Sequence, residues 1–117
     1  TYEISRLEAV LARGDRRLST VIEKAWRSGS KFDSWSECFH YEIWEQAMSE
    51  CGLDPAFYAN RIRAYDEVFP WDHLDYLVDR AFFVRENQKA HDAKTTPHCR
   101  SACAGCGINR KLGRNCF

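Results

Sequence analysis

The sequence lacks the features of a membrane protein, an exported protein or a large enzyme. It has no apolar run long enough to span a bilayer and no signal-peptide pattern, which predicts a soluble, cytoplasmic protein with no membrane partner. It also has no internal repeat and no low-complexity tract. With 117 residues the chain can bury one core but cannot form a complete barrel enzyme. It begins at Thr1 without an initiating Met, which predicts a piece of something longer.

Catalytic signatures are absent as well. There is no Ser-His-Asp arrangement, no glycine loop that would cradle phosphate and no paired-carboxylate pattern. His73 and His91 have no carboxylate or Cys partner at a catalytic spacing, so neither is expected to be a general base. We therefore do not expect this chain alone to be an enzyme.

The net charge is zero, but the charges are unevenly distributed along the chain. Residues 13–31 hold six basic and two acidic side chains, a net charge of +4. Residues 33–80 hold three basic and eleven acidic side chains, a net charge of −8, and residues 85–117 hold seven basic and two acidic, a net charge of +5. If the two basic segments meet, they form one positive face for a phosphate-bearing partner such as RNA. The alternative is that opposite charges pair within the domain.

The apolar spacing is helical throughout and predicts an all-α protein of about five helices. The expected helices lie at residues 4–11, 18–26, 37–51, from 55 through 65, and 73–90. We expect Gly14, Gly29 and Gly52 to end helices, and Asp15 and Asp72 to cap them. The first two helices are expected to form an antiparallel hairpin. These helices predict a domain at residues 1–92, followed by a Cys-rich tail at residues 93–117.

The tail contains three thiols, Cys99, Cys103 and Cys106, in the spacing Cys-x3-Cys-x2-Cys. Gly and Ala residues between them allow a short loop to curl around one centre, which suits a metal ion or an iron–sulfur cluster. The same spacing occurs in the cluster loop of radical S-adenosylmethionine (SAM) enzymes, but that loop lies near the start of a large barrel. A reducing cytosol disfavours disulfides, which leaves Cys38 and Cys51 as expected buried thiols.

Five motifs occur together in an order that carries a family resemblance. They are Gly14-Asp15-Arg16-Arg17-Leu18, Phe32-Asp33-Ser34-Trp35, Pro70-Trp71-Asp72-His73-Leu74, Arg85-Glu86-Asn87 and Thr95-Thr96-Pro97-His98-Cys99-Arg100. In this respect the chain resembles the C-terminal region of a family of cobalamin-binding radical SAM proteins. The resemblance implies a fragment or separate subunit of a larger enzyme, whose barrel binds SAM and a [4Fe–4S] cluster and follows a cobalamin-binding domain.

The tail departs from the family pattern at one position. The family closes its tail with a fourth Cys three positions after the third, and Asn109 stands there in this chain. Cys116 is the expected replacement, reached through a loop that contains Gly113. Three interpretations stay open: a zinc site of Cys99, Cys103, Cys106 and Cys116, an auxiliary [4Fe–4S] cluster, which the resemblance also allows, or a disordered tail with free thiols.

Several other residues are candidates for contact with a substrate or partner. Arg16 and Arg17 with Asp15 form a cluster that could bind a phosphate or carboxylate, or could be a capped, solvated turn. The other candidates for a substrate-facing groove are Asp33, Trp35, Trp71, Asp72 and His73. Their alternative roles are helix caps for Asp and core or interface packing for Trp.

Two functional hypotheses follow. In the first, the chain is an accessory C-terminal module that holds substrate or shields radical chemistry beside the barrel of the parent enzyme. In the second, it is a free-standing helical module, stabilised by a metal, that binds RNA or protein through its basic segments.

Overall fold

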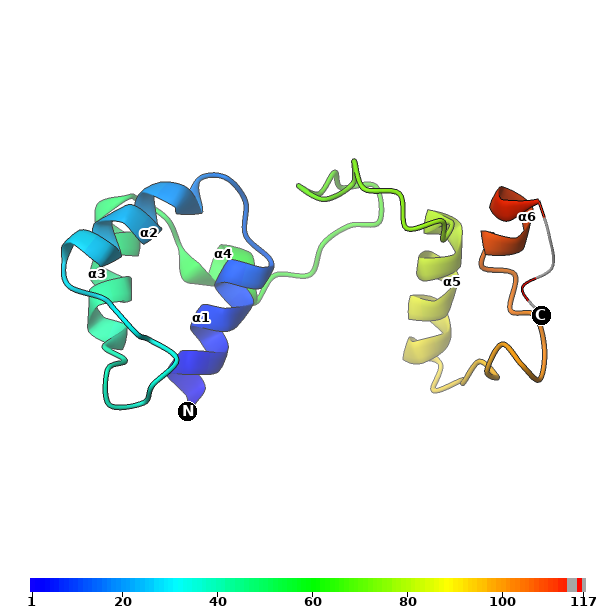
Figure 1. The fold of residues 1–117 in the computed structure, drawn as a ribbon, viewed down its shortest axis with the longest axis horizontal. Helices are drawn as coiled ribbons and strands as arrows, with labels where there is room; N and C mark the ends of the chain where they lie inside the picture. The colour runs from blue at the N-terminus through cyan, green and yellow to red at the C-terminus, as the bar shows by residue number, and fades with distance from the viewer. Residues whose placement is uncertain (114–115, 117) are drawn as a thin grey trace. The chain divides into compact units, whose positions relative to one another are not determined.

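The computed structural model describes residues 1–113 and 116, and within them the chain is helical with no strand (Figure 1). The described helices are α1 (Tyr2–Ala12), α2 (Leu18–Arg27), α3 (Tyr41–Glu50), α4 (Pro55–Ala59), α5 (Arg80–His91) and α6 (Ile108–Leu112). The all-α prediction is confirmed, with six helices in the described part where about five were expected. Arg114, which was counted in the basic tail, lies outside the described residues.

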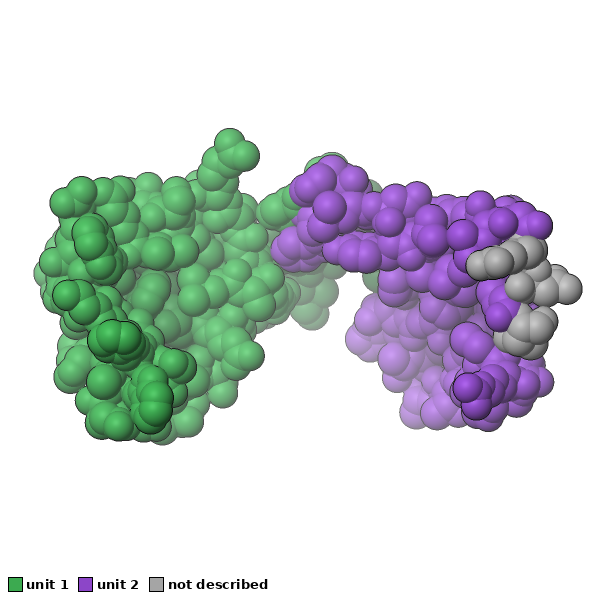
Figure 2. All heavy atoms as spheres, in the orientation of Figure 1, with its two compact units in different colours: residues 1–70 green, residues 71–117 purple. Residues whose placement is uncertain are grey.

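The chain divides into two compact units, unit 1 at residues 1–70 and unit 2 at residues 71–117 (Figure 2). The sequence predicted a boundary between residues 92 and 93, whereas this division falls between Pro70 and Trp71. Helix α5 therefore belongs to the same compact unit as the Cys-rich tail. Each unit is described by itself below.

Unit 1 is organised by two helix pairs, in which α1 packs chiefly against α4 and α2 chiefly against α3. The expected hairpin of the first two helices is therefore wrong as a description of the main packing. The buried core comprises Leu7, Val10, Leu18, Val21, Ala25, Trp44, Ala47, Met48 and Tyr58. Since these residues come from all four helices, each helix contributes its apolar face to a single core.

Local signals explain several helix ends in unit 1. Gly29 and Gly52 adopt left-handed conformations just after α2 and α3, with φ of +103° and +66°. In each case the next residue donates back to the helix, as in Ser30 N to Ala25 O, which satisfies a terminal carbonyl. The Asp54 side chain accepts from Ala56 N at 2.8 Å at the start of α4, as expected for an N-cap.

Two helices of unit 1 are shorter than predicted. Helix α3 starts at Tyr41 rather than near residue 37, because residues 30–40 form a loop held by Asp33. Helix α4 ends at Ala59 rather than near residue 65. The carbonyl oxygens of Ala59 and Arg61 both accept hydrogen bonds from the Arg13 guanidinium, so this segment leaves the helical path.

The expected long helix at residues 73–90 is also wrong at its start, since α5 begins at Arg80. Asp72 therefore does not cap it, and the N-cap position belongs to Asp79. Leu77 adopts φ of +64°, which interrupts a helix, and its amide donates to Asp75 Oδ1. The Asp79 amide donates to the carbonyl of Cys106 in the tail at 2.8 Å. If the helix began near residue 73, this amide would instead donate to a carbonyl of the preceding turn.

The tail of unit 2 is held along α5 by polar contacts. Arg85 Nη2 donates to Ala104 O at 2.6 Å, and Thr96 bridges Glu86 and Lys89. Gly107 has φ of +99°, and any Cβ there would lie 2.3 Å from a carboxylate oxygen of Asp79. Helix α5 contributes no buried residue, so it has little apolar packing to hold the tail in place. These hydrogen bonds and ion pairs therefore stabilise the position of the tail along α5.

Opposite charges pair within each unit, which supports the second interpretation of the charge distribution. In unit 1, Lys24 pairs with Glu50 at 2.9 Å. In unit 2, Lys111 pairs with Asp75 at 2.9 Å, and Arg110 pairs with Asp79. In the part of the chain that the structure describes, no helix combines the length and apolar character needed to cross a membrane.

Candidate functional site

A cleft of about 370 Å³ lies in unit 1, lined by charged side chains from the turn after α1 and from the segment after α4. Its charged residues are Arg13, Asp15, Arg17, Arg61, Arg63 and Glu67. We call this hollow the arginine cleft. Aromatic rings also line it, those of Phe57, Tyr58 and Phe69.

The turn between α1 and α2 forms the first wall of the arginine cleft. Gly14 is required there, because a Cβ would lie 2.8 Å from Val10 O and 2.0 Å from Leu18 Cδ1. Its φ is not left-handed, so Gly14 does not end α1 by the left-handed conformation that glycine can supply. Asp15 Oδ1 accepts from the Arg17 amide at 3.0 Å and so closes the turn that precedes α2. The N-cap position of α2 belongs to Arg17, so the prediction that Asp15 caps this helix is wrong.

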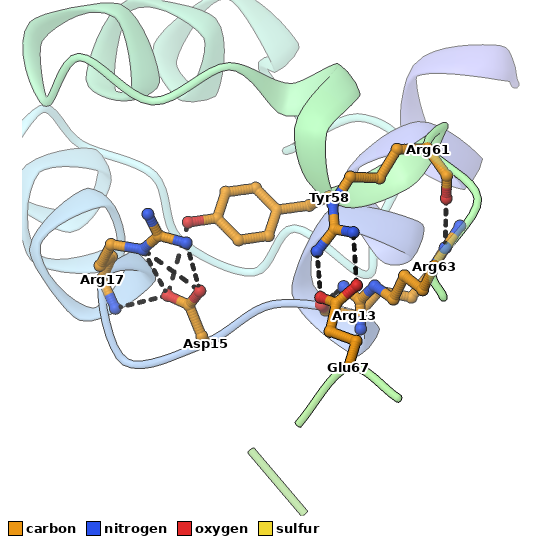
Figure 3. Close-up of polar contacts among 7 residues, drawn as sticks. All are labelled: Arg13, Asp15, Arg17, Tyr58, Arg61, Arg63 and Glu67. Atoms are coloured by element: carbon orange, nitrogen blue, oxygen red, sulfur yellow. Dashed lines mark hydrogen bonds and ion pairs between the residues drawn. The ribbon is translucent and has the colours of Figure 1, made fainter. Parts of the chain in front are cut away.

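Asp15 forms an ion pair with Arg17 and a contact with Tyr58 (Figure 3). Arg17 Nε and Nη2 donate to the two carboxylate oxygens at 3.0 and 2.7 Å, and the Tyr58 hydroxyl lies 3.4 Å from Asp15 Oδ1. The hydrogen bonds from Arg17 lower the pKa of Asp15, and burial raises the pKa of Tyr58. At neutral pH Asp15 is therefore ionised and Tyr58 is neutral.

Arginine-to-backbone hydrogen bonds connect this turn to the segment after α4. Arg13 donates to the carbonyl oxygen of Ala59 at 2.6 Å. It also donates to the carbonyl of Arg61 at 2.8 Å, and Arg63 donates to the carbonyl of Arg13 (Figure 3). Burial lowers the pKa of Arg63, and the nearby Arg13 and Arg61 charges act in the same direction. Arg13 and Arg63 thus hold the two walls together.

Arg61 and Glu67 form the second ion pair of the arginine cleft. The two guanidinium nitrogens of Arg61 donate to the two carboxylate oxygens of Glu67, one of them at 2.7 Å (Figure 3). These hydrogen bonds lower the pKa of Glu67. The Arg61 guanidinium also lies over the ring of Phe57, 4.4 Å from its centroid, and that of Arg17 lies 5.3 Å from the same centroid.

The arginine cleft therefore suits anion binding. Its four guanidinium groups outnumber its two carboxylates, which leaves a net charge of +2. Guanidinium forks match carboxylate and phosphate groups in shape and charge. The Arg17 side chain is 57% exposed and that of Arg61 is 30% exposed, so a ligand can reach both.

The predicted site residues of unit 1 are only partly brought together. Asp15 and Arg17 line the arginine cleft, whereas the exposed Arg16 does not. Asp33 accepts from the Ser30 hydroxyl and from Trp44 Nε1, so it fixes the loop before α3. Another predicted residue, Trp35, is an exposed side chain on that loop and lies outside the cleft.

Trp71, Asp72 and His73 belong to unit 2. Leu74 N donates to Trp71 O, so these residues lie in a turn, and Asp72 accepts from Arg80 Nη1 at 3.1 Å. Trp71 is half-buried, and the other two are exposed. Their predicted role in a groove stays a prediction.

The cysteines of the tail are free thiols. Cys99, Cys103 and Cys116 are exposed, and Cys106 is half-buried. Among residues 1–113 and 116, no three His, Cys, Asp or Glu side chains come together in a way that could hold a metal ion. In this arrangement the thiols do not fit a zinc ion or a cluster, and the predicted site stays a prediction.

Sequence reasoning missed Arg13, Tyr58, Arg61, Arg63 and Glu67 as members of one site. A weak signal was present, since Arg61 and Arg63 interrupt the acidic middle of the chain three and five positions after Tyr58. Comparison with protein-family models, with curated proteins and with solved structures finds no match to this chain. The family resemblance therefore depends on the motifs alone.

Proposed function

We propose that this chain is an accessory module of a cobalamin-linked radical SAM enzyme, and that its arginine cleft docks an anionic group of a substrate or partner. The enzyme's barrel would supply SAM and the [4Fe–4S] cluster, and a separate domain would bind cobalamin. Support for the parent enzyme comes from the order of the five sequence motifs. Support for docking comes from the cleft.

The observation that carries the docking role is the pair of accessible guanidinium groups, Arg17 and Arg61, in a cleft with excess positive charge. The same cleft is poorly suited to proton transfer near neutral pH. The pKa values of Asp15 and Glu67 are lowered and that of Tyr58 is raised, so each moves away from neutrality. Recognition is therefore better supported than acid–base catalysis.

Docking is tested by nuclear magnetic resonance titration of the full 117-residue chain. Phosphate, sulfate and succinate are added separately at low ionic strength. We expect shifts concentrated at cleft residues, and their loss in the double variant Arg17→Gln, Arg61→Gln. Arg27→Gln is the matched control, because Arg27 pairs with Glu23 on the exposed surface of α2. Unchanged cleft resonances with all three anions contradict the docking role.

The parent enzyme is tested by mixing the chain with the purified radical SAM barrel encoded with it. We expect a one-to-one complex in calorimetry and analytical ultracentrifugation. If the two polypeptides do not associate at roughly 100 μM, which corresponds to about −5.5 kcal/mol, the accessory role is wrong.

An alternative function is RNA binding, which the guanidinium groups beside the partly exposed ring of Phe57 favour, because bases stack on aromatic and guanidinium surfaces. In that case the chain binds single-stranded RNA without the barrel, and its affinity falls steeply as salt increases. A gel-shift series across salt concentrations separates this function from the first.

Metal binding by the tail stays a prediction beside these functions. Such a site would require Cys99, Cys103, Cys106 and Cys116 to lie close together. In the described residues these thiols do not form a group that could hold a metal ion. Elemental analysis with an ultraviolet–visible spectrum tests it, because zinc is colourless and an iron–sulfur cluster absorbs visible light.

A further inference from the structure

The arginine cleft has an apolar part as well as a charged part. Phe57 and Val68 both line it, and both residues are exposed to solvent, Phe57 by 42% and Val68 by 81%. Exposed apolar residues that are scattered singly over a surface are normal, but these two lie in one cleft of about 370 Å³. A ligand that covered them would remove apolar area from water and gain affinity from it.

A positive charge lies directly beside this apolar surface. The guanidinium carbon of Arg17 is 5.3 Å from the centroid of the Phe57 ring. The hydrogen bonds from Arg17 to Asp15 use Nε and Nη2, and Figure 3 shows the other terminal nitrogen, Nη1, pointing away from that carboxylate. An anion can therefore contact Nη1 while the hydrogen bonds to Asp15 stay intact.

The size and chemistry of the cleft favour a small carboxylate over a larger or more highly charged ligand. Ligand pockets usually have volumes of about 300–1,000 Å³, and about 370 Å³ lies near the lower end of that range. Nη1 of Arg17 carries two N–H groups, which the two oxygens of a carboxylate can accept. A phosphate would bring further charged oxygens against Phe57 and Val68, where they would lose water without gaining a donor.

We propose that the arginine cleft binds a small carboxylic acid with an aliphatic chain, whose carboxylate contacts Arg17 and whose chain lies against Phe57 and Val68. This inference rests on the proposed docking function and names its ligand class. A very short carboxylate such as acetate would use only the charged part of the cleft. A longer one would use both parts, because each CH₂ group that it buries adds to the affinity.

The inference predicts that affinity increases with chain length. In the series acetate, butanoate and hexanoate, each partly buried CH₂ group should strengthen binding about two-fold, below the limit of about four-fold for full burial. Hexanoate should therefore bind roughly ten-fold or more tightly than acetate. Hexanamide has a chain of the same length without the charge, and it should bind roughly ten-fold or more weakly than hexanoate.

Two exposed aliphatic residues of the segment after α4 provide a matched pair of variants. Val68→Ser removes apolar surface from the cleft, so it should lower the affinity for hexanoate about three-fold or more and leave the affinity for acetate unchanged. Ile62→Ser is the control, because Ile62 is 96% exposed and is not among the residues that line the cleft. Both are surface substitutions, and circular dichroism checks that each variant is folded.

The experiment is a titration of the full chain with the three carboxylates and hexanamide at low ionic strength, followed by nuclear magnetic resonance. In the wild type, nuclear Overhauser effects from hexanoate protons to the Phe57 ring and the Val68 methyl groups locate the aliphatic chain without any variant. A short acetylated glycine peptide that ends in valine is titrated in parallel, because it carries a carboxylate beside an aliphatic group at a peptide terminus.

The outcomes separate this inference from the docking function on which it rests. Hexanoate binding that exceeds acetate binding, and that weakens in Val68→Ser but not in Ile62→Ser, supports the inference. Equal binding of acetate and hexanoate, or an unchanged hexanoate affinity in a folded Val68→Ser variant, overturns it and leaves the docking function standing.

The remaining outcomes concern the charge and the source of the carboxylate. Hexanamide binding as tight as hexanoate binding overturns the role of Arg17 and with it the inference. Tighter binding of the peptide than of hexanoate assigns the carboxylate to a protein terminus and overturns the small-molecule ligand. If no anion moves the cleft resonances, the docking function itself fails.

Discussion

The clearest test of the structure concerns Asp33, which the sequence placed among substrate-facing candidates. Its carboxylate accepts from the Ser30 hydroxyl and from Trp44 Nε1, the latter at 3.1 Å. Both donor residues are buried, each with 7% of its surface exposed. Asp33→Ala would leave both donors without this acceptor in a place that water reaches poorly.

The expected loss follows from these two contacts. An unsatisfied buried donor costs about 1–3 kcal/mol, so we expect Asp33→Ala to lower the free energy of unfolding of unit 1 by about 2–4 kcal/mol. For a unit of this size the melting temperature should fall by roughly 8 °C or more. Asp33→Asn keeps an acceptor oxygen, and its loss should stay below about 1 kcal/mol.

The assay is urea unfolding of the full chain, followed by circular dichroism at 222 nm. Ser34→Ala serves as the control, since Ser34 is the exposed neighbour of Asp33 in the same loop. A loss below about 0.5 kcal/mol in Asp33→Ala would refute the structural role, because exposed substitutions fall in that range. Asp33 would then return to the list of candidates for ligand contact.

The remaining predictions concern the cleft and the tail. Gly14→Ala should destabilise unit 1 by about 1–3 kcal/mol in urea unfolding, because its Cβ has no space beside a backbone carbonyl. Asp15 and Glu67 have folded pKa values below their ordinary values of 3.8 and 4.5, so their contribution to stability is present above those values and lost as pH falls through the folded pKa. As the pH is lowered below about 4.5, the urea concentration at the unfolding midpoint should therefore decrease, and it should decrease less in Glu67→Gln. The same pH dependence in that variant as in the wild type would contradict the stabilising role of the Arg61–Glu67 ion pair. Thr96→Val should speed amide exchange in residues 93–98 about ten-fold relative to Thr95→Val, because it removes the bridge to α5, and equal exchange in the two would show that the bridge is weak. A chelator should leave the helix content unchanged, since hydrogen bonds hold the described tail; a loss of signal would mean that metal–sulfur bonds are needed.

The sequence predicted features that depend on a few neighbouring residues. The all-α class followed from apolar spacing, and the ends of α2 and α3 followed from glycines that adopt positive φ. The start of α4 at Asp54-Pro55 is equally local. Prediction failed where distant groups compete for backbone atoms. Helix α5 starts late because the Asp79 amide bonds to Cys106, 27 positions further along the chain.

Within the candidate site, the sequence alone determined the turn that carries Asp15 and Arg17, because the carboxylate reaches an amide only two residues away. Only the tertiary structure decided that this turn faces Arg61. That arrangement depends on Arg13 donating to carbonyl oxygens 46 and 48 positions along the chain. No local pattern encodes such a contact, because it forms only after the helices have packed around their shared core.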